Sequence, residues 1–233
     1  MRQWAAACTR YAFPDACVLC GGQATGYFCA PCFSGLPRIA FACSRCGVPL
    51  PTALPDGVPC ASCQLHPPPF RAARAALLYA FPVDTALKAL KFRHRLCYAP
   101  AFAELLQTEL LLHFPNVDAL VPVPLHRTRH ATRGFNQALE LCKPLRRQTG
   151  LPLVRNARRI RRTEAQTGLN VIERRRNLRN AFSIAGELRC HHPLIVDDVM
   201  TTGETCRQLA RALQNAGAKT VSVLTVARAA PPR

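Results

Sequence analysis

The sequence predicts an α/β domain with a mostly parallel sheet flanked by helices, preceded by a small cysteine-rich module. Before residue 64 the chain carries four Cys-x2-Cys pairs. After three prolines at 67–69, apolar strand patterns alternate with helical patterns. Strands that alternate with helices form βαβ units, whose parallel sheets are covered on both faces. We therefore place the cysteine-rich module at 1–66 and the α/β domain at 70–233.

The four cysteine pairs predict two structural zinc ions. A Cys-x2-Cys turn points two thiolates at one ion, and structural zinc takes four ligands in a tetrahedron, with no open position. Sequential pairing of the turns closes the shorter loops at lower entropic cost, although an interleaved pairing also satisfies the spacing. The glycines after Cys20 and Cys46 suit a turn that needs positive φ. The expected ligand sets are Cys17, Cys20, Cys29 and Cys32, then Cys43, Cys46, Cys60 and Cys63.

The remaining features of the cysteine-rich end indicate a cytoplasmic protein. Arg10 interrupts the only apolar stretch that could serve as an export signal, so we expect thiols and metal ligands rather than disulfides. No apolar run reaches the roughly 18 residues of a membrane span, so we expect no membrane insertion. The five isolated cysteines are expected to be small buried apolar residues. These are Cys8, Cys97, Cys142, Cys190 and Cys206.

Hydrophobic periodicity gives the elements of the α/β domain in order. Strands are predicted where short apolar or β-branched runs are bounded by turn residues, at 74–81, 118–124, 179–184, 193–198 and 219–228. Helices are predicted where apolar residues recur at helical spacing, at 83–92, 101–114, 136–148 and 204–217.

The segment LIVDDVMTTGET, 194–205, predicts a ligand site at the end of a strand. The strand delivers Asp197 and Asp198 to its carboxyl end, where open α/β sheets bind ligands. The loop 201–205 then offers backbone N–H groups and threonine hydroxyls to an anion, and Gly203 permits close approach. Carboxylates beside a phosphate cradle fit the hydroxyls of a sugar phosphate, or a metal. The segment is not a Walker A loop, because it has no Lys and the acidic pair comes first.

This segment resembles the 5-phosphoribosyl 1-diphosphate (PRPP) motif of type I phosphoribosyltransferases. The resemblance implies a type I phosphoribosyltransferase-like fold, in which Asp197 and Asp198 engage the ribose hydroxyls, Mg2+ accompanies PRPP and 201–205 hold the 5'-phosphate. Pro193 departs from the usual motif, which has another strand residue there. The catalytic candidates are the two aspartates. The PRPP-binding set is Asp197, Asp198, Val199, Met200, Thr201, Thr202, Gly203, Glu204, Thr205, Pro124 and Arg133.

Three further segments resemble the ComF/GntX family of competence-associated proteins, with a double zinc ribbon before the transferase-like domain. They are LKF at 90–92, VPVPLHRTRHATRGFNQA at 121–138 and TEAQTGLNVIERRRNLRNAF at 163–182. The resemblance places 123–125 at the pyrophosphate loop. It places Arg127, Arg129 and Arg133 in a mobile loop over it, and Gln166, Leu169, Arg174 and Asn177 in a second family signature. It implies a protein that binds PRPP and single-stranded DNA and assists transformation or recombination. Its implied protein partners are DNA-uptake or recombination proteins.

The charge of the chain independently favours a polyanionic partner. The net charge is +18, and nine arginines between 155 and 179 face only Glu164 and Glu173. PRPP cannot use so many cations, whereas nucleic-acid phosphates can. A general bias towards Arg and Ala, or a solvated face, is the competing explanation. The expected nucleic-acid residues are Arg158, Arg159, Arg161, Arg162, Arg174, Arg175 and Arg176.

The residues leave the presence of catalysis open. In an active phosphoribosyltransferase, Asp197, Asp198 and Mg2+ would stabilise an oxocarbenium-like transition state while a nucleophile displaces pyrophosphate. A third interpretation is a PRPP-sensing interaction protein without chemistry. Whether a group that accepts the phosphoribosyl unit exists would distinguish the active transferase from the two binding functions. The resemblance implies that the zinc ribbons take the place of the hood by which type I enzymes select a base, and the ribbon sequence has no obvious base-reading residues.

Overall fold

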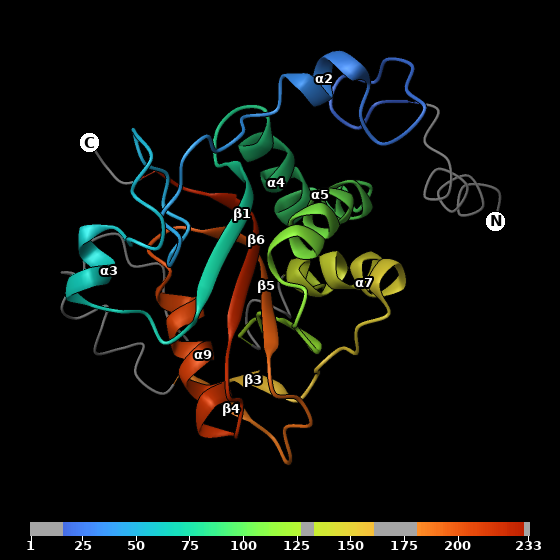
Figure 1. The fold of residues 1–233 in the computed structure, drawn as a ribbon. Coiled ribbons are helices and arrows are strands. Elements are labelled where there is room, and N and C mark those ends of the chain that lie inside the picture. The colour runs from blue at the N-terminus through green and yellow to red at the C-terminus, as the bar shows by residue number, and fades with distance from the viewer. Residues whose placement is uncertain (1–15, 127–132, 161–180, 231–233) are drawn as a thin grey trace, which may run out of the picture.

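The computed structural model describes residues 16–126, 133–160 and 181–230, and its main domain has the predicted α/β fold (Figure 1). The four strands of the central sheet are β1 (Ala72–Leu78), β2 (Ala119–Pro122), β5 (Pro193–Met200) and β6 (Ser222–Arg228). The helices that cover this sheet are α4 (Val83–Phe92), α5 (Tyr98–His113), α7 (Gln137–Thr149) and α9 (Glu204–Asn215).

The sheet is parallel throughout, with the strand order β1-β6-β5-β2. Strand β5 is central, since Ala119 of β2 lies opposite Pro193 and Thr225 of β6 lies opposite Asp197. Pro193 is accommodated as the first residue of its strand, where a ladder hydrogen bond is least needed. Because parallel strands end at the same edge, the loops after β2 and β5 meet there.

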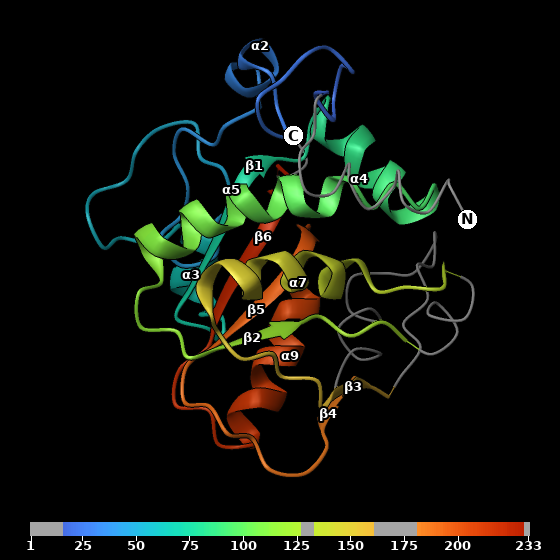
Figure 2. The ribbon, with the colours of Figure 1, turned by 90° about the vertical axis from the view of Figure 1, so that its right-hand side faces the viewer.

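The two faces of the sheet bury separate cores. Leu194 and Val196 of β5 pack in a core with α4, α5 and α7, whereas Ile195 packs in a core with α9. This is the period-two alternation of a strand that is covered on both sides. Figure 2 shows α5 and α7 lying across one face, and Figure 1 shows α9 on the other. Helix α7 begins as predicted, with the side chain of Asn136 accepting hydrogen bonds from two backbone N–H groups of its first turn.

A small second sheet differs from the sequence-based expectation. The predicted strand at 179–184 is observed as β4 (Phe182–Ile184), but it pairs antiparallel with β3 (Ala157–Arg159) and not with the main sheet. Phe182 packs in the same core as α9. A three-residue strand such as β3 is too short to produce a periodic pattern, which is why the sequence analysis missed it.

The cysteine-rich module contains two short helices, α2 (Ala30–Ser34) and α3 (Ala61–Leu65), and its second half docks against β1. The backbone N–H of Ala73 donates to the carbonyl of Arg45 at 2.9 Å. Gly47 packs next to this hydrogen bond and has φ +64°. A Cβ at this position would lie 2.8 Å from the Ala73 carbonyl oxygen. The second cysteine turn is therefore fitted to the edge strand.

The docking contact predicts different effects for two equivalent glycines. Gly21 holds the same place in the first cysteine turn, with φ +77°, but an added Cβ meets nothing within 4 Å. Both alanine variants carry backbone strain, while Gly47→Ala alone pushes the second turn away from β1. We expect Gly47→Ala to melt several degrees below Gly21→Ala by calorimetry, since about 1 kcal/mol moves Tm by roughly 2 to 4 °C in a protein of this size. Equal melting temperatures would contradict the docking contact.

Candidate functional site

Two adjacent carboxylates stand at the carboxyl end of β5. Asp198 is 3% exposed, while Asp197 is half-buried. Asp198 forms an ion pair with the ammonium group of Lys91, at the end of α4, and its Oδ1 is 3.5 Å from Nε2 of Gln137 on α7. Asp197 Oδ1 accepts a hydrogen bond from the Asp198 backbone N–H at 2.9 Å. Asp198 is thus held by groups from two helices, and Asp197 lines the adjoining cavity.

Burial and mutual repulsion disfavour the charged form of Asp197 beside Asp198. Burial raises the pKa of Asp197 well above its usual range, and the neighbouring Asp198 carboxylate raises it further. Lys91 opposes this shift only in part. A cation or hydroxyl donors brought to Asp197 would stabilise its charged form.

The segment RGFNQ, 133–137, builds the wall opposite this pair. Arg133 Nη1 donates to Gln137 Oε1 at 2.8 Å, so the arginine holds the amide that faces Asp198. Asn136 Nδ2 donates to the Val123 carbonyl at 3.0 Å while its Oδ1 caps α7. This motif therefore fixes the loop after β2, which the family resemblance assigns to pyrophosphate, to the helix that bears Gln137.

The loop after β5, which we expected to hold an anion, turns at Gly203 and leads directly into helix α9. Gly203 lies at φ +78°, a left-handed backbone conformation that favours glycine, and a Cβ there would displace the flexible end of the Met200 side chain. The backbone N–H groups that follow open helix α9. The side chain of Glu204 accepts from Gln208 Nε2 at 2.7 Å and is thereby directed along the helix. Thr201 and Thr202 are exposed at the tip.

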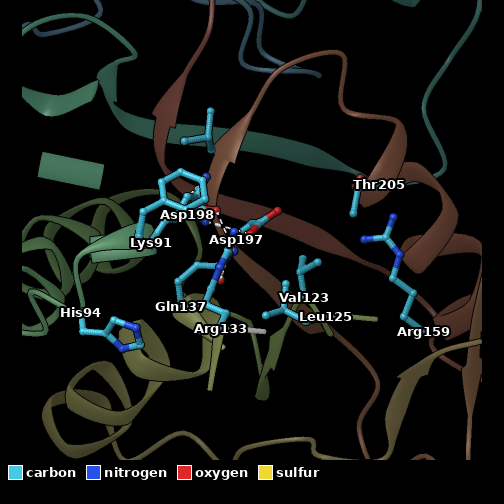
Figure 3. Close-up of a pocket in the computed structure, with 12 residues that line it drawn as sticks. Lys91, His94, Val123, Leu125, Arg133, Gln137, Arg159, Asp197, Asp198 and Thr205 are labelled. Carbon is cyan, nitrogen blue, oxygen red and sulfur yellow. Dashed lines mark hydrogen bonds and ion pairs between the residues drawn. The ribbon is translucent and has the colours of Figure 1, made fainter. Parts of the chain in front are cut away.

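A cavity of about 670 Å³ joins these parts (Figure 3). This volume lies within the usual range for small-molecule sites. Figure 3 shows Thr205 and Arg159 on one side of the cavity, with Lys91 and Asp198 on the other. The lining residues combine three cations with the two carboxylates and a mixed remainder: Lys91, Arg133, Arg159, Asp197, Asp198, Phe92, His94, Val123, Leu125, Gln137, Val199 and Thr205.

The predicted site residues fall into three groups in the structure. Those that line the cavity are Asp197, Asp198, Val199, Thr205 and Arg133, while Met200 to Glu204 form the adjoining loop and Pro124 lies between two lining residues. Arg159, which we expected at a nucleic-acid surface, lines the same cavity, and Arg158 is exposed. Outside the described residues lie Arg127, Arg129, Arg161, Arg162, Gln166, Leu169, Arg174, Arg175, Arg176 and Asn177.

Sequence reasoning gave no role to Lys91, His94 and Gln137, although all three line the cavity. Lys91 and Gln137 belong to the LKF and RGFNQ segments, which resemble family motifs. That resemblance was the signal available. The ion pair with Asp198 joins residues far apart in the chain, which no local pattern reports.

The eight paired cysteines form two clusters, and the predicted sequential grouping is confirmed. Cys17, Cys20, Cys29 and Cys32 gather in one cluster and Cys43, Cys46, Cys60 and Cys63 in the other, with all sulfurs of a cluster within 4.8 Å of one another. The Cys20 and Cys29 sulfurs are 3.6 Å apart, and those of Cys46 and Cys60 are 3.8 Å apart. Sulfurs placed tetrahedrally about 2.3 Å from zinc are about 3.8 Å from each other, so both clusters fit the ion.

Hydrogen bonds to sulfur favour the thiolate form of Cys43 in the second cluster. The backbone N–H groups of Arg45 and Cys60 donate to Cys43 Sγ at 3.4 and 3.2 Å. Burial raises the pKa of Cys43, but these donors outweigh it and lower the pKa to about 7. Thiolates are the form that binds zinc, so the two clusters and their backbone donors suggest two structural zinc ions.

The isolated cysteines behave largely as expected. Cys142, Cys190 and Cys206 are buried, Cys97 is half-buried, and Cys8 lies outside the described residues. Burial raises the pKa of Cys190 to about 11, which keeps it as an inert thiol.

A second, basic hollow lies where the cysteine-rich module meets the α/β domain. Its volume is about 320 Å³, and its cations come from three segments: Arg45, Arg71 and Lys219. Arg45 stands between two zinc-ligand positions, and its buried Nε has no hydrogen-bond partner among the described residues. Arg71 and Lys219 are exposed. The hollow therefore offers cationic donors to an anion.

None of the helices described here is long and apolar enough to cross a membrane.

Comparison with known proteins agrees with this architecture. A phosphoribosyl transferase domain model matches residues 131–232, and a double zinc ribbon domain model matches residues 8–64. The DNA utilization protein YhgH of Shigella flexneri is 36% identical over 226 residues, which cover 92% of this chain and 97% of the relative. Competence protein F of Haemophilus influenzae is 30% identical over 227 residues, covering 91% and 96%.

A more distant relative has the same kind of name. Competence protein ComFC of Bacillus subtilis is 29% identical over 161 residues, which cover 66% of this chain and 63% of the relative. Two of these relatives are named as competence proteins, and the third is named for DNA utilization. With its double zinc ribbon, its parallel phosphoribosyltransferase-type sheet and similarity along nearly its whole length, this chain belongs to the ComF/GntX family.

Proposed function

We propose that the protein binds PRPP together with Mg2+, binds single-stranded DNA at a separate surface, and assists DNA uptake, transformation or recombination in the cytoplasm. DNA-uptake or recombination proteins are its proposed partners. The observation that carries the PRPP part is the juxtaposition of Asp197 and Asp198 with the loop that turns at Gly203, across one cavity. The names of the relatives support the DNA part.

The chemistry of PRPP matches the cavity part by part. The 5'-phosphate suits the backbone N–H groups at the start of α9, and the ribose hydroxyls suit the oxygens of Asp197. The diphosphate would lie towards the loop at 123–125, where Arg133 and Lys91 supply cations. Asp197 and Asp198 are also hard oxygen ligands of the kind Mg2+ prefers. Bound there, Mg2+ would neutralise part of the diphosphate charge.

For DNA, we propose the basic hollow of Arg45, Arg71 and Lys219 and the exposed Arg158 as phosphate contacts. The hollow is separate from the PRPP cavity, with which it shares no lining residue. The net charge of +18 favours a polyanion as a partner, and the three cations of the hollow offer donors to its phosphates. Arginines 161, 162 and 174–176 remain proposed contacts from their sequence alone.

An active phosphoribosyltransferase is the alternative function, because the aspartates that would bind PRPP could also stabilise a ribosyl transition state. The cavity contains no side chain that identifies an acceptor. Pyrophosphate release from PRPP distinguishes the two functions, measured with single-stranded DNA or with a panel of nucleobases. Release with one acceptor establishes the transferase. Release with none of them leaves the binding function.

We predict two zinc ions per chain and a structural role for both. Cys17→Ser and Cys60→Ser each remove one ligand from a different cluster. Each variant should therefore retain one zinc and lose the fold of its ribbon, because metal binding supplies the folding free energy of such small modules. Metal analysis and circular dichroism measure both effects. One zinc or none in the unmodified protein would contradict the assignment.

We predict that mutation of the two aspartates affects PRPP binding but not DNA binding. Asp197→Asn with Asp198→Asn should abolish PRPP binding, because neutral amides cannot replace charge-assisted acceptors and attract Mg2+ less strongly. Oligonucleotide binding should be unchanged or slightly stronger, since two negative charges are lost. Titration calorimetry with each ligand at matched salt makes the comparison. Loss of both affinities in a variant that still melts cooperatively would show one shared site.

We predict a reduced salt dependence of DNA binding when the basic hollow is neutralised. Arg71→Gln with Lys219→Gln should lower the slope of log K against log salt by roughly 0.7 per lost phosphate contact. The control is Lys88→Gln with Lys143→Gln, which removes equal charge from lysines already paired with Asp84 and Glu140. Fluorescence anisotropy at several salt concentrations measures both slopes. Equal slopes for the two variants would remove the hollow from the DNA surface.

A further inference from the structure

A buried arginine links the second cysteine cluster to the loop after β5. Arg228, the last residue of β6, is 6% exposed. Its Nη1 donates to the Met200 carbonyl at 2.9 Å and to the Thr201 carbonyl, and its Nε donates to the Cys46 carbonyl at 3.4 Å. One guanidinium group thus contacts the carbonyl of a predicted zinc ligand and the two peptide groups that lead into the loop at 201–205, called the phosphate loop below. The planar fork of arginine permits this, whereas a lysine ammonium is a single point of contact.

The charge of Arg228 needs compensation, because burying an unpaired cation is costly. Among the described residues, Arg228 forms no ion pair with a carboxylate. A zinc ion with four thiolates carries a formal charge of about −2, from one dication and four anions. The cluster of Cys43, Cys46, Cys60 and Cys63 therefore supplies negative charge next to the guanidinium when zinc is bound.

The same hydrogen bonds orient the first peptide groups of the phosphate loop. In a planar trans peptide the C=O and N–H groups point in opposite directions. Because the carbonyls of Met200 and Thr201 face Arg228, the N–H groups of Thr201 and Thr202 are turned away from it. The threonines themselves are exposed, so this is the side from which an anion approaches. The Met200 carbonyl also accepts from the Ala229 backbone N–H at 3.0 Å, so Arg228 acts chiefly on the Thr201 carbonyl and thereby on the direction of the Thr202 N–H.

We propose that Arg228 is a positioning residue through which zinc in the second cluster orders the phosphate loop. Only the identity of the ligand, PRPP, rests on the proposed function. In the described chain no hydrogen bond joins residues 17–32 to the phosphate loop at 201–205. The coupling therefore belongs to the second cluster and not to the first. Zinc there acts on the ligand site through one side chain, in addition to folding its ribbon.

Hydrogen exchange and zinc release test this coupling without any ligand. In the full-length, zinc-loaded protein, Arg228→Met should raise amide exchange at 200–205 and accelerate release of one of the two zinc ions to a chelator. Arg228→Lys keeps the charge but not the fork, so it should give the same change in the loop and a smaller one in zinc release. The control is Arg189→Met, at an exposed arginine paired with Glu187. Unchanged loop exchange in folded Arg228 variants would overturn the proposal.

A double-mutant cycle tests the effect on the ligand. Arg228→Met and Cys46→Ser should each weaken PRPP binding by roughly 2- to 30-fold, the usual range for mutations that change the coupling between two sites. If both act through one link, the double variant should lose little more than either single variant. Fully additive losses would overturn the coupling. Failure of the unmodified protein to bind PRPP would refute the proposed function instead, and hydrogen exchange would still decide the role of Arg228.

Discussion

Two adjacent carboxylates at the end of a buried strand are the constraint on which the arrangement of the site depends. Such a pair repels itself and loses hydration, so the structure surrounds it with compensating groups. Lys91 reaches Asp198 from the end of α4, and Gln137 reaches it from the start of α7. Arg133 holds that amide in turn. The compensation is incomplete at Asp197, whose pKa stays raised despite Lys91.

Parallel topology brings these groups to one edge. Because β2, β5 and β6 run in the same direction, their carboxyl ends share one edge with the cavity. At the same edge, Arg228 at the end of β6 donates a hydrogen bond to the Cys46 carbonyl of the second ribbon. The cysteine-rich module is therefore more than an appendage of the α/β domain. It contributes Arg45 to the basic hollow, and its Cys46 carbonyl accepts a hydrogen bond from Arg228, which also holds the loop after β5.

Much of this fold could be predicted from local chemistry. The Cys-x2-Cys spacing predicted two clusters, and the lower cost of closing short loops favoured the sequential grouping over an interleaved one. The apolar run before Asp197 predicted the strand that carries the two aspartates to its carboxyl end. The roles of Lys91 and Arg228 could not be predicted, because each depends on a partner distant in the chain. The same limit explains Arg159. Its charge indicates an anion, but only the pairing of β3 with β4 directs it to the cavity.

Titration calorimetry of the zinc-loaded protein with PRPP, in the presence and absence of Mg2+, tests the central claim most directly. Ribose 5-phosphate and pyrophosphate serve as partial ligands. The arrangement of loop, aspartates and cations predicts one PRPP per chain, tighter with Mg2+ than without, and weaker binding of either part alone. No heat of binding with PRPP under either condition, in a protein that contains both zinc ions and melts cooperatively, would contradict it.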